Sequence, residues 1–140
     1  MLERLALVAA LLVVVALFGA WWRRREGRVA TPARTTAPGF RHEELAAVGL
    51  DAPDAEWLAL LLGSPTCAPC RSVEQVLTEV ARERPGLRWV EVDAADHLDI
   101  ARTHHVLRVP TLFVIEPGGR IAARTSGVPA VRDLLAVLAR

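Results

Sequence analysis

The two cysteines of this sequence, Cys67 and Cys70, are separated by two residues in the segment SPTCAPC at 64–70. Paired thiols at this spacing can close and reopen a disulfide, because a thiolate attacks a disulfide sulfur and a neighbouring thiol then displaces the product. The pair could instead supply half of a zinc site, or consist of two buried side chains without chemistry. The surrounding elements and the supply of further ligands decide among these three interpretations.

The segments on either side of the cysteines predict a strand followed by a helix. Residues 56–62 (EWLALLL) form a continuous apolar run of strand length, typical of a strand buried on both faces. Apolar residues recur at helical spacing after Cys70, and Pro85 with Gly86 ends that helix. Cys67 is therefore expected in a first helical turn, where free backbone amides and the helix dipole favour the thiolate and lower the pKa of the thiol.

This position favours redox chemistry. Pro69 costs little in a first turn, because the amide at that place has no intrahelical partner. Cys70, about one turn later and facing inward, is placed to attack a mixed disulfide formed at Cys67. An inert buried pair would have no need of a place at the start of a helix.

A zinc site needs four ligands, usually two cysteine pairs or one pair with two suitably spaced histidines. The histidines, none of which shows that spacing, are His42, His97, His104 and His105. We therefore expect no metal site. His104 and His105 end a predicted helix, where capping or solvation is expected rather than catalysis.

The rest of the domain predicts further helices and strands. A short helix is expected at 41–50, strands at 87–92, 111–116 and 120–124, and helices ending near 103 and 138. Asp93 or Asp96 is expected to cap the helix that ends near 103, and Pro129 to begin the last helix. The order β-α-β-α-β-β-α predicts an α/β fold, a mixed central sheet flanked by helices.

The charge of the domain argues against nucleic acid as a partner. Residues 41–140 contain eleven arginines and fourteen acidic residues. Binding to phosphates needs clustered positive charge, which this balance does not provide. All seventeen basic residues of the chain are arginine, a bias that suggests a GC-rich bacterial coding sequence.

Residues 5–22 form an uncharged apolar stretch of eighteen residues that ends in Trp21 and Trp22. A helix of this length spans roughly 27 Å at about 1.5 Å per residue, close to the hydrocarbon thickness of a bilayer. A cleaved signal peptide or a buried core helix is the alternative. The weakly basic start and the WWRRR that follows disfavour a signal peptide, and apolar residues on every face disfavour a core helix. We expect a transmembrane anchor at 1–25.

More positive charge follows this stretch than precedes it. Arg23, Arg24, Arg25 and Arg28 lie on its carboxyl side, and Arg4 on the other. The positive-inside rule then predicts a single-pass protein of the cell membrane with its domain in the cytoplasm; an extracytoplasmic domain is the alternative. Residues 26–40, with their glycines, prolines and threonines, predict a flexible tether to a domain at 41–140.

Three motifs together resemble the thioredoxin superfamily, and most of all its small membrane-tethered bacterial members. They are TCAPC at 66–70, VPT at 109–111 and the GG hairpin at 118–119. The resemblance covers residues 56–139 and implies a thioredoxin-like fold. It implies that Cys67 is the nucleophile and Cys70 the resolving thiol, with no metal or other cofactor beyond their disulfide.

The resemblance also implies a cis peptide bond between Val109 and Pro110. In the family this proline packs against the sulfurs, and the backbone before it pairs with the substrate chain. Thr66 would contact substrate as well, and Ala68 and Pro69 would form the active-site loop.

Several residues depart from the family pattern. Thr66 stands where tryptophan is usual, Ala68 replaces glycine, and Gln75 replaces a helix-kinking proline. Leu61 occupies the place of a buried acid that assists proton transfer, which leucine cannot do. Whether Glu91 reaches Cys70 in its stead is left open by the sequence.

We therefore expect a membrane-anchored thiol-disulfide oxidoreductase that reduces protein disulfides and draws electrons from a thiol or a membrane donor. Two alternatives remain. One is an extracytoplasmic thiol reductant of the cytochrome c maturation type, and the other is a non-catalytic module whose cysteine pair senses redox state.

Overall fold

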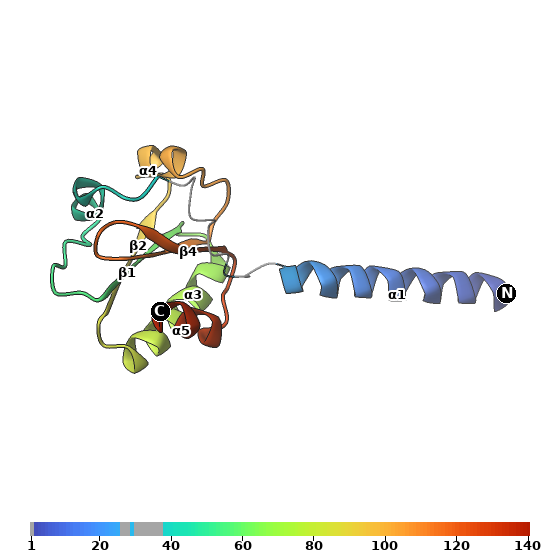
Figure 1. The fold of residues 1–140 in the computed structure, drawn as a ribbon. Helices are drawn as coiled ribbons and strands as arrows, with labels where there is room; N and C mark the ends of the chain where they lie inside the picture. The colour runs from blue at the N-terminus through green and yellow to red at the C-terminus, as the bar shows by residue number, and fades with distance from the viewer. Residues whose placement is uncertain (1, 26–28, 30–37) are drawn as a thin grey trace.

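The computed structural model describes residues 2–25, 29 and 38–140 (Figure 1). The predicted tether at 26–40 lies outside the described residues, except for 29 and 38–40. The helices and strands, in chain order, are α1 (Leu2–Arg25), α2 (His42–Ala47), β1 (Trp57–Gly63), α3 (Ala68–Glu83), β2 (Leu87–Asp93), α4 (Leu98–Thr103), β3 (Thr111–Ile115), β4 (Ile121–Ser126) and α5 (Val131–Leu138).

The four strands form one mixed sheet in the order β2-β1-β3-β4. Strand β1 pairs with β2 in parallel and with β3 in antiparallel, and β3 pairs with β4 in antiparallel. Helices α3 and α5 cover one face of the sheet, and α2 and α4 lie on the other side (Figure 1). The predicted α/β fold with a mixed central sheet flanked by helices is confirmed.

The central strand β1 is apolar throughout because both of its faces are covered. Leu58, Leu60 and Leu62 point into the core on the side of α2 and α4. Ala59 and Leu61 alternate with them and point into the core beneath α3 and α5. The residues of β2 and β3 that face α3 can thus be identified by the register of each strand with β1.

The predicted starts of two helices are wrong. His97, not Asp93 or Asp96, is the N-cap of α4, and it makes no side-chain capping bond. Asp93 is instead the last residue of β2, and its carboxylate accepts a hydrogen bond from the Ala95 N–H at 2.8 Å. Pro129 lies before the N-cap of α5, so it precedes the helix rather than beginning it.

His104 is expected to cap a helix or to be solvated at its end, but the structure buries its side chain. It is the C-cap residue of α4, but its ring is buried and stacks on Phe40 with the ring centroids 3.8 Å apart. The Phe40 N–H donates to the Gly119 carbonyl oxygen at 2.7 Å. Gly119 has φ +82, and a Cβ there would stand 2.0 Å from the Phe40 carbonyl oxygen, so the position requires glycine. Chain segments far apart in sequence therefore enclose His104.

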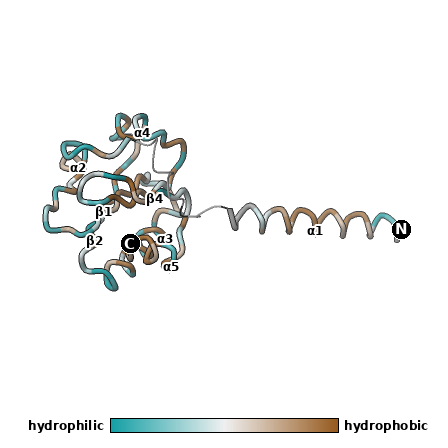
Figure 2. Tube along the Cα trace, in the orientation of Figure 1, coloured by the Kyte–Doolittle hydropathy of each residue, from teal (hydrophilic) through white to brown (hydrophobic). Residues whose placement is uncertain are grey.

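Helix α1 is apolar over much of its length (Figure 2), and its large apolar side chains that are described are exposed. Within the described part of the chain, no helix combines the length and the apolar character that a membrane crossing needs. The predicted span at 5–22 includes residues 5 and 22, whose side chains lie outside those described.

Candidate active site

The two cysteines lie at the junction of β1 and α3. Cys67 is the N-cap of α3 with an extended backbone (φ −80, ψ 94), and Ala68 and Pro69 begin the helix. The Cys67 N–H donates to the Ser64 carbonyl oxygen at 3.0 Å, and the Cys70 N–H donates to the Cys67 carbonyl oxygen at 3.2 Å. The loop after the strand thus turns Cys67 to the positive end of the helix dipole, where a thiolate is stabilised.

Cys67 and Cys70 form a disulfide with their Cα atoms 5.4 Å apart. The two partners differ in accessibility: Cys67 is half-buried, whereas Cys70 is only 2% exposed. Thr66, Ala68 and Pro69 around them are exposed. An external thiol or disulfide would therefore meet Cys67 first, and Cys70 is shielded from solvent.

The Val109–Pro110 segment lies at the same edge of the sheet. Thr111 pairs with Leu62, so the residue before Thr111 lies beside the end of β1 that leads to the cysteines. The Val109–Pro110 peptide bond is cis, the isomer that the resemblance implies. Hydrogen bonds hold the segment: Thr111 Oγ1 donates to the Arg108 carbonyl oxygen at 2.7 Å, and the Gly127 N–H donates to the Pro110 carbonyl oxygen at 3.0 Å.

Pro110 is buried, whereas the Val109 side chain is 36% exposed. Within the described part of the chain, neither the N–H nor the carbonyl of Val109 pairs with another backbone group. The segment therefore presents an unpaired peptide unit beside the cysteine loop, which is the arrangement needed to add an extended partner chain.

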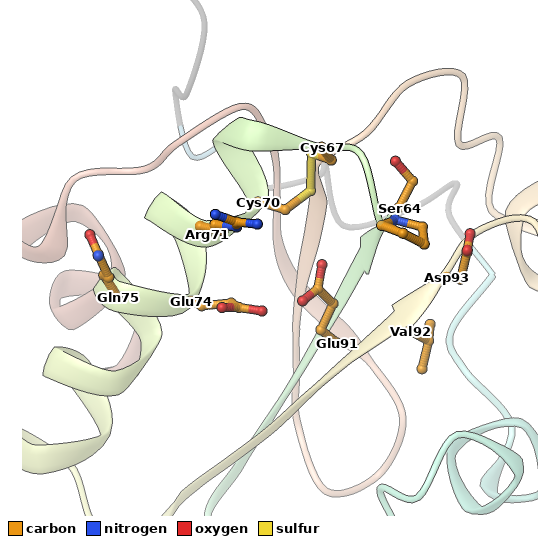
Figure 3. Close-up of a pocket in the computed structure, with 10 residues that line it drawn as sticks. Ser64, Cys67, Cys70, Arg71, Glu74, Gln75, Glu91, Val92 and Asp93 are labelled. Atoms are coloured by element: carbon orange, nitrogen blue, oxygen red, sulfur yellow. A yellow bond between two sulfur atoms is a disulfide. The ribbon is translucent and has the colours of Figure 1, made fainter.

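An open pocket of about 530 Å³ lies beside the disulfide (Figure 3). It is lined by Ser64, Pro65, Cys67, Cys70, Arg71, Glu74, Gln75, Glu91, Val92 and Asp93. Thr66, Val109 and Pro110 do not line it, so the sites expected for substrate lie outside this pocket. The pocket instead joins the cysteines to carboxylates of α3 and β2.

The sequence leaves open whether Glu91 reaches Cys70, and the structure shows where its carboxylate lies. It pairs with Leu61 in the parallel register of β1 and β2, and paired residues project to the same face. A Cβ added at Gly63 would stand 2.1 Å from Glu91 Oε1 and 3.1 Å from Cys70 Sγ. The carboxylate and the resolving sulfur therefore lie against the same glycine, and the missing side chain at Gly63 leaves space for both.

Glu91 also contacts a second carboxyl group. A hydrogen bond with Glu74 raises the pKa of Glu91 to about 7, and partial burial and the negative charges of Glu74 and Asp93 act in the same direction. Two carboxyl groups can hydrogen-bond only when one carries a proton. Near neutral pH, Glu91 can thus both hold and release a proton beside Cys70.

The described residues include no group of three or more His, Cys, Asp and Glu side chains arranged to hold a metal ion. His104 lies in the aromatic core rather than near the cysteines.

Comparison with known proteins agrees with this geometry. The thioredoxin family model matches residues 54–140. Thioredoxin C-2 of Corynebacterium nephridii is 28% identical over 102 residues, which cover 71% of this chain and 87% of that protein. A thioredoxin of Pyropia yezoensis is 31% identical over 67 residues, which cover 47% of this chain and 63% of that protein. The chain spans less than two thirds of the length of several curated relatives that it matches.

Two solved structures share the fold. A mutant thioredoxin of Halobacterium salinarum superimposes with a TM-score of 0.56 at 22% identity, covering 69% of this chain and 80% of that one. Oxidised mitochondrial thioredoxin 3 of Saccharomyces cerevisiae gives a TM-score of 0.53 at 22% identity, covering 62% and 80%. With the family model matching more than half of its residues, the chain belongs to the thioredoxin family.

Proposed function

We propose that this protein is a thiol-disulfide oxidoreductase that reduces disulfides in other proteins. One observation carries the proposal: the Cys67–Cys70 disulfide closes at the N-terminus of α3 with one sulfur accessible and the other shielded. That asymmetry suits a nucleophile and a resolving thiol, because only the first should react with an external partner.

In the reducing direction, the Cys67 thiolate attacks a substrate disulfide, and one substrate sulfur leaves as a thiolate. Cys70 then attacks Cys67 Sγ, the mixed disulfide breaks, and the second substrate sulfur is released. Two electrons pass to the substrate, and the Cys67–Cys70 disulfide remains. A thiol or a membrane electron donor must reduce this disulfide before the next cycle. The chemistry needs no cofactor beyond the cysteine pair.

The substrate chain would bind along the unpaired peptide unit of Val109. Its N–H and carbonyl are available for strand-like pairing, and Thr66 lies on the loop that leads to Cys67. Recognition through main-chain hydrogen bonds accepts many substrate sequences, which suits an enzyme that reduces disulfides in different proteins.

The same proposal includes a membrane anchor. Residues 5–22 lack charge, and the described apolar side chains of α1 are exposed rather than packed on the domain. The arginines that follow the stretch favour a cytoplasmic domain in a bacterial cell. There the cysteine pair would reduce disulfides near the inner face of the membrane.

The direct test uses the reduced full chain in detergent and insulin as a protein disulfide. Turnover is expected for the natural chain, none for Cys67→Ser, and trapped mixed disulfides for Cys70→Ser. A reversible disulfide without turnover would overturn the proposal in favour of a redox sensor.

Protease digestion of spheroplasts expressing the full chain tests the location. A protected domain would support the cytoplasmic site. Digestion from outside would replace it with an extracytoplasmic reductant that needs a membrane electron donor. Recovery of the full chain in the soluble fraction would overturn the anchor.

A further inference from the structure

Resolution of the mixed disulfide requires a proton acceptor, because Cys70 must lose a proton before it can attack. Its side chain is only 2% exposed, so bulk water has little access to Sγ. Leu61, the residue that replaces the usual buried acid beneath α3, has no group that could accept a proton. The charged side chains that line the adjoining pocket are Arg71, Glu74, Glu91 and Asp93.

Geometry separates Glu91 from the other two carboxylates. Its Oε1 and Cys70 Sγ both approach the position of a Cβ on Gly63, at 2.1 and 3.1 Å. The sum of these distances is the largest separation that the oxygen and the sulfur can have, so one water at most fits between them. The Asp93 carboxylate accepts the Ala95 N–H and is held in its own turn.

Glu74 supports Glu91 rather than replacing it. It lies on α3, one turn after Cys70, and hydrogen-bonds to the Glu91 carboxyl. Figure 3 shows the two carboxyl groups extending toward each other from α3 and β2, with the disulfide above them. This bond holds the Glu91 side chain against the Gly63 backbone.

We infer that Glu91 accepts the proton of Cys70 during resolution of the mixed disulfide, and that Glu74 is the residue that positions it. The inference rests on the proposed function. The proton acceptor would then lie on β2, at the residue paired with Leu61, and not on the central strand β1 at position 61 itself.

In this step the Cys70 S–H bond breaks and its proton moves to the Glu91 carboxylate, directly or through one water. The resulting thiolate forms the bond to Cys67 Sγ as the bond from Cys67 to the substrate sulfur breaks. The substrate sulfur leaves with the electron pair and takes a proton from solvent. Reduction of the Cys67–Cys70 disulfide runs the same transfer backwards, with Glu91 returning the proton to Cys70.

The electrostatics of the pocket support this role. The pKa of Glu91, raised to about 7 by Glu74, by burial and by Asp93, lets the carboxyl exchange a proton at neutral pH. The negative charges of Glu74 and Asp93, which also line the pocket, oppose ionisation of the Glu91 carboxyl. The helix N-terminus acts mainly on Cys67, the N-cap residue, and less on Cys70 in the next turn.

The first test measures resolution alone. A mixed disulfide between Cys67 of the full chain and a small aromatic thiol is prepared at low pH, and release of the thiol is followed after a jump to higher pH. Glu91→Gln is expected to slow release by about 100-fold at pH 7 and to remove the break in its pH profile near that value. Glu91→Asp should keep a carboxyl and part of the rate. Glu83→Gln, an exposed glutamate at the end of α3, is the matched control.

Glu74→Gln tests whether Glu74 only positions Glu91. Thiol release should remain measurable in this variant, and the break in its pH profile should move to lower pH. The reason is that the carboxyl hydrogen bond and the negative charge that hold the proton on Glu91 are removed. Equal rates and equal pH profiles for the natural chain and Glu91→Gln would overturn the inference and leave the reductase proposal intact.

A second test does not depend on turnover. In the Cys67→Ser chain, the ultraviolet absorbance of the thiolate reports the ionisation of Cys70. Coupling to Glu91 predicts a titration in two steps, which Glu91→Gln reduces to one step at lower pH. If the natural chain fails to reduce insulin but this coupling is present, the reductase proposal fails and the proton link stands. Identical Cys70 titrations in the Cys67→Ser chain with and without Glu91→Gln would overturn the proposed proton transfer.

Discussion

Two ionisable side chains with shifted pKa values, Glu91 and His104, lie on opposite faces of the same sheet and differ in their surroundings. Glu91 faces α3 and lines an open pocket, where its carboxyl group hydrogen-bonds to that of Glu74. His104 lies in the aromatic core against Phe40 and Phe113, and within the described part of the chain neither of its ring nitrogens has a hydrogen-bond partner. Both pKa values move toward the neutral form, upward for Glu91 and downward for His104.

The difference lies in partners and access. Burial is the main cause that lowers the pKa of His104, with Arg124 and His105 acting in the same direction against the opposing charge of Glu44. Its ring therefore serves as a flat packing surface. Glu91 has a neighbouring carboxyl group, a pocket and a sulfur beside it, so its proton can move. A shifted pKa indicates a catalytic role only where a proton donor or acceptor lies within reach of the group.

The largest effect that sharpens this comparison is expected from His104→Ala. Loss of the ring removes the stack on Phe40 and leaves a cavity, at a cost of about 3 kcal/mol in the free energy of unfolding. Urea denaturation of the oxidised chain measures this cost. The resolution rate of the folded variant should equal that of the natural chain; a slower rate would show that the two faces are coupled.

Gly63→Ala tests the opposite face with a smaller effect. The new Cβ would take the space of Glu91 Oε1 and displace the carboxylate from Cys70 Sγ. We expect resolution to slow by about 10-fold, with a change of less than about 1 kcal/mol in stability, because a flexible side chain can move aside. Stopped-flow release of the thiol measures the rate.

Gly86→Ala is the matched control for that variant. Its Cβ would stand 2.8 Å from a carboxylate oxygen of Glu56, an exposed glutamate that does not line the cysteine pocket. Equal slowing by both glycine substitutions would contradict the special role of Glu91.

The pH dependence of stability should separate the two groups by sign. The pKa of Glu91 is about 7 in the folded chain, against 4.5 for an ordinary glutamate, so the folded state holds more protons between these values. The free energy of unfolding contributed by Glu91 therefore falls as the pH rises from 4.5 to 7. Glu91→Gln should remove this fall in urea titrations of the oxidised chain. An unchanged slope would mean that the carboxyl is ionised throughout.

His104 should give the opposite slope, and the smallest effect of the four. Its pKa is lowered from 6.5 by burial, so the unfolded chain binds a proton below that pH more readily than the folded chain. The contribution of His104 is present above pH 6.5 and is lost as the pH falls. His104→Phe keeps a ring against Phe40 and should remove this loss. A loss of stability in acid equal to that of the natural chain would assign it to other groups.

Sequence patterns predicted the fold because each strand carries its own signal. The apolar run at 56–62 lies within one residue of β1, and the motif around Cys67 was placed correctly at a strand-to-helix junction. The exposure difference between Cys67 and Cys70 also matches helical spacing. These features depend on residues close together in the chain.

Features that depend on distant residues were missed. Alternation along β2 places Trp89 and Glu91 on one face, but only the register with β1 shows that this face is the one beneath Cys70. Burial of His104 needs Phe40, which lies far before it in the sequence. Asp93 fits a capping pattern, yet strand pairing with Gly63 extends β2 through it. Register and long-range packing are therefore the physical limits of the sequence interpretation.

The contact between Phe40 and Gly119 has a mechanical consequence. Phe40 lies just before α2, and its backbone N–H is bonded to the turn between β3 and β4. This turn lies at the end of β3 away from Thr111 and the cysteine edge. Tension that reaches Phe40 along the backbone would therefore pass into this hairpin, at the end of β3 opposite the bond between Cys67 and Cys70.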